Sequence, residues 1–142
     1  MNSSKVTRWM IATAALAVAA GSASAQTYTA EIPMPFRVGK TTMAPGLYRI
    51  RIDPQEALKV VSIRNLGNRE LVVANAAVKD DVPKAWAEEH KPALGFECVG
   101  ETCALRSLWN AQDSFAYLFS VRNLPVGEKT VKPVMLKRVK AD

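Results

Sequence analysis

Two cysteines are the side chains with the most definite chemistry in this 142-residue chain. Gly100-Glu101 between Cys98 and Cys103 suits a two-residue type II′ β-turn, in which the glycine takes a positive φ. If Val99 pairs with Thr102 across that turn, the two cysteines face each other at an α-carbon separation of about 4.5 Å, which a disulfide can span. We therefore predict a hairpin held by a Cys98–Cys103 disulfide. Redox or metal chemistry is the alternative, although a redox pair more often shows Cys-x-x-Cys at the start of a helix.

The single histidine, His90, follows Glu88 and Glu89 in a polar segment that lacks the partners catalysis needs. A histidine general base requires an orienting carboxylate and a nucleophile or substrate across a pocket, and no serine stands in a nucleophile-elbow pattern. Consecutive side chains point apart, so these three residues cannot together hold one metal ion. The sequence also contains no glycine-rich phosphate loop. We therefore predict no catalytic residue, no metal site and no cofactor.

The same segment contains a candidate interaction surface made of Trp86, Glu88, Glu89 and His90. It lies in the stretch 80–92, the longest part of the expected domain without a strand pattern. An exposed tryptophan among charged residues is the type of anchor that dominates protein interfaces. The alternative is that the indole ring folds onto the core and covers one end of it. The sequence favours neither, and the partner would be an unidentified protein or an envelope polymer.

Carboxylates scattered along the chain leave a hydrolase as an alternative function. A pair of acids that face each other across a sugar could carry glycoside hydrolysis. Their spacing in the sequence does not bring them together, but the fold could do so. The candidates are Asp53, Glu56, Glu97 and Glu101.

Two further groups of side chains have a structural and a functional interpretation. The first is an aromatic stripe that is expected to pack in the core and would form a carbohydrate or peptide platform if exposed. The second is a set of C-terminal cations, expected on a solvated edge strand where lysines block edge-to-edge pairing, with contact to an anionic polymer as the alternative. The stripe is Phe115, Tyr117 and Phe119, with Trp109 just before it, and the cations are Lys129, Lys132, Lys137, Arg138 and Lys140.

Residues 1–25 have the three-part pattern of a secretory signal peptide. A positively charged start and an apolar run that ends at Ala20 precede Ala23-Ser24-Ala25, the small residues that a signal peptidase requires. The apolar run is too short to span a bilayer. We expect cleavage before Gln26 and a protein that is periplasmic or secreted. Both locations are oxidising, and there a disulfide is the default state of two neighbouring cysteines.

The expected mature chain, residues 26–142, is long enough for one domain with its own core and too short for two. Removing Lys5 and Arg8 with the signal segment leaves 17 of the 19 Lys and Arg against 13 Asp and Glu, a net charge of +4. That net charge is well below the clustered positive charge expected on the surface of a nucleic-acid-binding protein, so no specific nucleic-acid partner is predicted. No second apolar run approaches the roughly 20 residues of a membrane helix, so we expect no transmembrane segment after cleavage.

Turn residues interrupt the mature chain at short intervals, and the runs between them alternate or are rich in Val, Ile and aromatic residues. Such runs are typical of strands, whereas the segment 83–89 is expected to form one helical turn or a loop. Seven or eight short strands without a long helix predict an all-β domain, a single antiparallel β-sandwich or open barrel. The expected strands are 29–38, bent or at an edge because of Pro33 and Pro35, and 47–52, 58–64, 70–78, 94–99, 102–109, 114–121 and 131–139.

Period-2 alternation also assigns the faces of two expected strands. In the strand 47–52, one face is apolar and the other carries Arg49 and Arg51. In the strand 70–78, which follows a turn at Gly67-Asn68, one face is apolar throughout. The apolar faces are Tyr48, Ile50 and Ile52 in the first strand, and Val72, Ala74, Ala76 and Val78 in the second.

Two short motifs resemble the opening of a group of small secreted bacterial proteins. Pro35-Phe36-Arg37-Val38-Gly39 is similar to their P-F-x-V-G, and the segment 43–50 is similar to their L-P-A-G-x-Y-x-V, with Ala-Pro-Gly in place of Pro-Ala-Gly. A later hairpin that ends near an aromatic residue is usual in the group, as between Leu94 and Trp109, whereas the two cysteines depart from its pattern. The resemblance covers roughly residues 33–109, implies a β-sandwich fold, and carries no activity or site residue to this chain.

The sequence favours a binding function over a catalytic one, because rigid strands and the loops between them are sufficient to present a binding surface. We therefore expect an exported, non-catalytic β-sandwich that binds a partner or contributes to an envelope or extracellular structure. Two alternatives remain. One is a periplasmic hydrolase built from scattered carboxylates, and the other is a surface-fibre subunit that adds its strand to the sheet of the next protomer.

Overall fold

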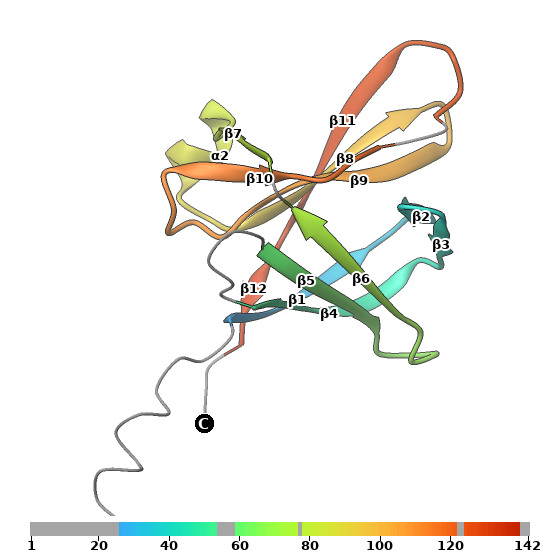
Figure 1. The fold of residues 1–142 in the computed structure, drawn as a ribbon, viewed down its shortest axis with the longest axis horizontal. Coiled ribbons are helices and arrows are strands. Elements are labelled where there is room, and N and C mark those ends of the chain that lie inside the picture. The colour runs from blue at the N-terminus through green and yellow to red at the C-terminus, as the bar shows by residue number, and fades with distance from the viewer. Residues whose placement is uncertain (1–25, 54–58, 77, 122–123, 140–142) are drawn as a thin grey trace, which may run out of the picture.

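The chain folds into two facing β-sheets with one short helix, and the sheets do not close into a barrel (Figure 1). The computed structural model describes residues 26–53, 59–76, 78–121 and 124–139, so the expected signal segment lies outside them. Strand pairs are antiparallel except for a single parallel bridge between Arg37 and Ala104. The predicted all-β, sandwich-like fold is confirmed, although the described residues form twelve strands and not seven or eight.

The first sheet, sheet A, has five strands in the order β12-β1-β4-β5-β6. Their bounds are β1 Gln26–Ile32, β4 Gly46–Asp53, β5 Lys59–Asn65, β6 Leu71–Ala76 and β12 Lys137–Arg138. The second sheet, sheet B, has the order β11-β8-β9-β10-β7, and β2 attaches to β9 with β3 beside it. Their bounds are β2 Phe36–Val38, β3 Thr41–Met43, β7 Val78–Asp81, β8 Ala93–Val99, β9 Thr102–Trp109, β10 Phe115–Leu118 and β11 Lys129–Met135. The helix, α2, spans Lys84–Glu89.

The chain passes from one sheet to the other four times, which ties the two layers together. The first passage is at Pro33 and Pro35, whose nitrogens cannot donate to a ladder, so β1 ends in sheet A and β2 begins in sheet B. The bend predicted there is confirmed. The second passage lies between β3 and β4, and the third lies between β6 and β7. The fourth lies between β11 and β12 at Leu136, which is buried and donates its N–H to the Pro92 carbonyl at 2.9 Å.

The core between the sheets is built from alternate positions of their strands. In β4, Tyr48, Ile50 and Ile52 are buried, as predicted. Arg49 and Arg51 alternate with them on the solvent side. Burial of alternate side chains in the core therefore fixes which residues of β4 face the solvent.

The predicted inward face of β6 is confirmed only in part. Val72 and Ala74 pack against the core, and Ala76 is buried. Val78 is 58 % exposed, because it begins β7, which belongs to sheet B. The prediction of one continuous strand over 70–78 is therefore wrong, since the alternation does not continue across the passage between the sheets.

A β-bulge in β9 changes which side chains face the core. At Gly95–Phe96 of β8 the pairing shifts by one residue, which leaves Arg106 of β9 without a counterpart in the ladder. An extra residue reverses the alternation beyond it. Leu105 before the bulge and Leu108 after it both lie in the main core. Trp109 consequently lies on the outer side of sheet B, in a second and smaller apolar cluster.

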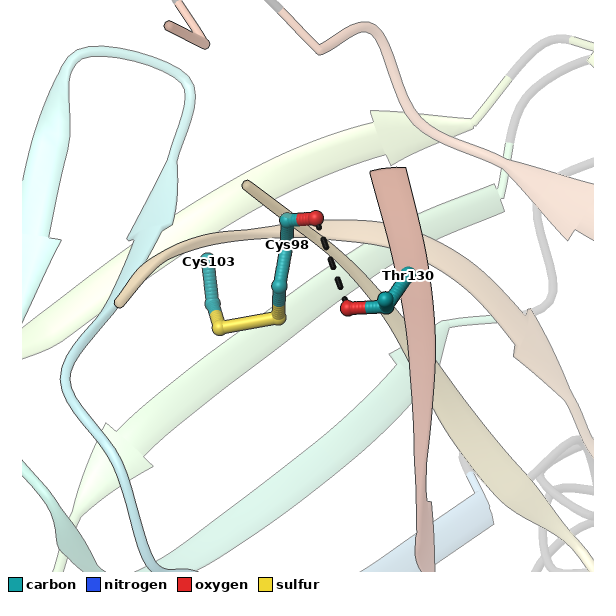
Figure 2. Close-up of a disulfide and its surroundings, with 3 residues drawn as sticks. All are labelled: Cys98, Cys103 and Thr130. Carbon is teal, nitrogen blue, oxygen red and sulfur yellow. Dashed lines mark hydrogen bonds between the residues drawn. A yellow bond between two sulfur atoms is a disulfide. The ribbon is translucent and has the colours of Figure 1, made fainter. Parts of the chain in front are cut away.

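The predicted hairpin and its disulfide are confirmed (Figure 2). Cys98 faces Cys103 with their α-carbons 4.1 Å apart, and the two sulfur atoms are bonded. Gly100 has a φ of +60° whereas Glu101 has no positive φ, as a type II′ turn requires. Both cysteines are buried in the main core, and the Cys98 carbonyl accepts a hydrogen bond from Thr130 Oγ1 of β11 at 3.5 Å. The disulfide therefore fixes the register of β8 and β9 at their shared end.

Replacing Cys98 and Cys103 with alanine should lower the free energy of unfolding by about 1–3 kcal/mol while the fold is retained. The closed loop is short, so the disulfide removes little entropy from the unfolded chain, and the two smaller side chains leave space in the core. Urea unfolding followed by circular dichroism measures the difference. Two titratable thiols in the folded, oxidised protein would contradict the assignment, and so would a variant that is unfolded in buffer.

Candidate functional site

Four arginines gather on the solvent side of sheet A. The alternation that buries one face of β4 turns Arg49 and Arg51 outward, and the same alternation in β5 turns Arg64 outward. Arg49 lies directly opposite Arg64 in the pairing of β4 with β5. Arg69, in the turn between β5 and β6, adds a fourth guanidinium group beside the end of these strands.

These four arginines line an open groove of about 570 Å³, which we call the arginine groove. The other lining residues carry no charge, so the groove combines four positive charges with no negative one. A surface of this kind attracts anions and raises their local concentration. The uncharged lining residues are Ser62, Asn65, Leu66 and Leu71.

Three of the four guanidinium groups make no ion pair with a carboxylate of the described residues. Arg51 is the exception: its Nε lies 3.4 Å from Asp53 Oδ1, in a surface pair worth at most about 1 kcal/mol. Arg49 and Arg64 place like charges directly opposite on one face of a sheet, which destabilises the pairing. A bound anion would relieve that repulsion, and guanidinium groups form paired hydrogen bonds with carboxylate and phosphate oxygens.

The turn that presents Arg69 is held by a buried asparagine. Asn65 Oδ1 accepts hydrogen bonds from the N–H groups of Gly67 at 2.8 Å and Asn68 at 3.0 Å. Arg69 has a φ of +67° and donates its own N–H to the Asn65 carbonyl at 2.9 Å. These bonds fix the path of the predicted Gly67-Asn68 turn and keep Arg69 beside the groove.

The structure buries the aromatic residue of the predicted interaction surface. Trp86 is 5 % exposed and packs in the outer cluster of sheet B with Ala93, Trp109 and Ala116. Gly95 leaves room for the indole, since a β-carbon there would lie 3.0 Å from Trp86 Cη2. Of the two interpretations of Trp86, the structure therefore shows the one in which it covers part of the protein interior, and an exposed tryptophan anchor is wrong.

The other three residues of that surface, Glu88, Glu89 and His90, are exposed at the end of α2. His90 has a φ of +53° and donates its N–H to the Trp86 carbonyl at 2.9 Å, which ends the helix. Its ring lies edge-on to that of Trp109, with the ring centroids 6.1 Å apart. In the described structure His90 therefore caps the C-terminus of α2. The binding role of Glu88, Glu89 and His90 stays a prediction.

Trp86→Ala should lower the free energy of unfolding by about 3–5 kcal/mol, because it removes one of the two tryptophan side chains of the outer cluster. Glu88→Ala and Glu89→Ala are matched controls on the same helix, and each should change stability by less than about 0.5 kcal/mol. Thermal and urea unfolding measure all three variants. A Trp86→Ala protein that melts like the unmodified one would contradict the packing described here.

The described carboxylates considered for hydrolysis are divided between the two sheets. Asp53 pairs with an arginine on sheet A, whereas Glu97 on sheet B pairs with Lys129 at 3.2 Å. Glu101 is exposed in the turn between β8 and β9, and Glu56 lies outside the described residues. In the described part of the chain, no three His, Cys, Asp or Glu side chains group into a metal site.

The polar side chains around Asp113 form hydrogen bonds with one another and with the neighbouring backbone. Asp113 Oδ2 accepts from Tyr117 Oη at 2.5 Å and from Asn110 Nδ2 at 3.1 Å. Asn110 Oδ1 in turn accepts from the N–H groups of Gln112 and Asp113, which closes the turn between β9 and β10. Burial, followed by the hydrogen bond and charge of Asp113, raises the pKa of Tyr117 above its usual value of 10. The neutral phenol therefore stabilises the fold below pH 10, and this contribution is lost as the pH rises further.

The aromatic stripe and the C-terminal cations lie where their structural interpretations place them. Tyr117 and Phe119 are buried, and Phe115 is partly buried against the same core, so the exposed-platform alternative is wrong. Trp109 does not continue this stripe, because the bulge in β9 turns it to the outer cluster. The cations occupy the edge strands β11 and β12, except Lys140, which lies outside the described residues.

No protein-family model, curated protein or solved structure matches the chain. The resemblance to small secreted bacterial proteins therefore stays a prediction. The sequence predicts Arg49 and Arg51 on one face of a strand, but it does not predict the arginine groove. The residue that could have indicated the groove is Arg64 in the next strand. Its position opposite Arg49 can be deduced only when the register of β4 and β5 is known.

Proposed function

We propose that the protein is an exported, non-catalytic binding module whose arginine groove holds an anionic polymer of the cell envelope or its surroundings. The observation that carries this proposal is the direct opposition of Arg49 and Arg64 in a groove with four arginines and no acidic lining residue. Such an arrangement destabilises the unliganded sheet. A bound anion is the simplest way to remove the repulsion.

The spacing of the cations favours a linear polymer over a single small anion. Neighbouring strands lie about 4.8 Å apart, and alternate residues along one strand lie about 6.8 Å apart. Arg49, Arg51 and Arg64 therefore form a grid of charges at these intervals. A polymer with a phosphate, sulfate or carboxylate on each repeating unit could contact several guanidinium groups at once, and linked contacts of this kind gain strength from multivalency.

The proposed export is supported by the signal-peptide pattern of residues 1–25 and by the Cys98–Cys103 disulfide. Such bonds persist in oxidising compartments and are rare in the reducing cytosol. Within the described ranges, no helix has the length and apolar character needed to cross a membrane. A mature chain with a net charge of +4 in an envelope would meet anionic polymers directly.

Replacing Arg49 and Arg64 together with glutamine should weaken binding to an anionic polymer at least tenfold. Each lost charge-assisted hydrogen bond costs about 1.5–3 kcal/mol, and a factor of ten corresponds to about 1.4 kcal/mol. The measurement is isothermal titration of residues 26–142 with polyphosphate, dextran sulfate and polygalacturonate at low salt. The matched control is Lys129→Gln with Lys132→Gln, which removes the same charge from β11.

A site in the groove predicts that the control binds within about twofold of the unmodified protein, and that affinity falls as the salt concentration rises. An equal loss of affinity in both double variants would mean that net charge alone attracts the polymer, which is contrary to the proposal. Shortening of any of the three polymers during incubation would instead favour the hydrolase alternative.

A further inference from the structure

One sheet edge in the described structure lacks the features that prevent pairing with another strand. Five strands stand at an edge there, namely β3, β6, β7, β11 and β12. Two of them, β3 and β12, have only three and two residues, β7 carries one lysine and two aspartates, and β11 carries two lysines and a proline. Short length, charge and proline are the usual protection of an edge. β6, beside β5 in Figure 1, has six residues and none of these protections.

At three positions of β6, the backbone hydrogen-bonding groups have no partner strand among the described residues. Asn65 donates its N–H to the Glu70 carbonyl at 2.8 Å, so these two residues form a hydrogen-bonded pair between β5 and the start of β6. Bonded and non-bonded pairs alternate along an antiparallel ladder. The N–H and C=O groups of Leu71, Val73 and Asn75 therefore point away from β5, whereas the residues between them bond to it.

The apolar side chains at these positions are exposed as well. Leu71 is 48 % exposed and Val73 is 54 % exposed, on the face of sheet A that carries the arginine groove. No residue of β6 is charged, so an added strand would not be repelled at this edge. Such a strand would satisfy the outward backbone groups and cover both apolar side chains.

We propose that β6 pairs with β6 of a second copy of this chain, antiparallel and about a two-fold axis beside Val73. In this register Val73 faces Val73 of the second copy, and Leu71 faces Asn75 of the second copy. All three outward residues of each strand then find a partner, and every side chain stays on its own face of the sheet. The strand is self-complementary in this arrangement, with valine against valine at the axis, which favours a second copy over a different partner.

This register keeps the arginines of the two copies apart. Arg64 lies opposite Leu71 in its own copy, so the next residue across the interface is the uncharged Asn75 of the second copy. The two β5 strands would lie about 14 Å apart, three strand spacings, which exceeds the screening length of about 8 Å at physiological salt. Both arginine grooves would open on one face of a continuous sheet. The dimer rests on the edge of β6 and not on the proposed function, although one polymer could span both grooves.

Sedimentation equilibrium of residues 26–142 tests the pairing. We expect a reversible monomer–dimer equilibrium, and Val73→Lys should weaken the dimer at least tenfold because it places two ammonium groups opposite each other at the axis. Val131→Lys is the matched control, since Val131 is 70 % exposed on the edge strand β11, and it should leave the equilibrium unchanged. Arg49→Gln with Arg64→Gln should also leave it unchanged, which separates failure of the dimer from failure of the groove.

Amide hydrogen exchange gives a second readout that needs no variant. Protection of the Leu71, Val73 and Asn75 amides should rise with protein concentration, while the amides between them are protected at every concentration. A chain that stays monomeric at submillimolar concentration, or whose Val73 amide exchanges freely there, would overturn the proposal. Growth beyond the dimer would also overturn it, because a two-fold interface closes on itself. The proposal would also be overturned if Val131→Lys weakened the dimer as much as Val73→Lys does.

Discussion

The pairing register of the antiparallel strands is the constraint on which the rest of the structure depends. Ile50 faces Ile63 across β4 and β5, and both are fully buried in the core. A slip of one residue would move that apolar face to solvent and turn an arginine into the core instead. An unpaired guanidinium group costs several kcal/mol to bury, so the core admits only one register. The same packing therefore holds Arg49 opposite Arg64 and builds the arginine groove as a consequence.

In sheet B, a disulfide, a tight turn and a β-bulge fix the register of β8 and β9. The disulfide and the turn at Gly100 align β8 with β9 at one end, and the bulge at Arg106 shifts the alternation by one residue further along. As a result, Leu108 enters the main core while Trp109 packs with Trp86 on the opposite face. One extra residue thus gives sheet B two apolar faces, one against sheet A and one beneath α2.

The parts of this fold that depend on neighbouring residues could be predicted from the sequence. Gly100-Glu101 between two cysteines defines a turn, a register and a disulfide within a few residues, and all three are present. The prolines at 33 and 35 predict a bend, but they do not predict that the chain changes sheets there. The burial of Trp86 depends on Gly95 and on the bulge, which are brought beside it by the folding of sheet B and not by adjacency in the sequence. The arginine groove could not be predicted for the same reason, since its two opposed arginines become neighbours only through the pairing of β4 with β5.

Whether the arginine groove binds anions is tested most directly by nuclear magnetic resonance of the arginine Nε–H groups during titration of residues 26–142 with a short polyphosphate. We predict that the signals of Arg49 and Arg64 shift together and saturate, while the signal of Arg138 on the edge strand β12 changes little. Shifts of equal size at all arginines, or unchanged signals at Arg49 and Arg64, would contradict a binding site in the groove.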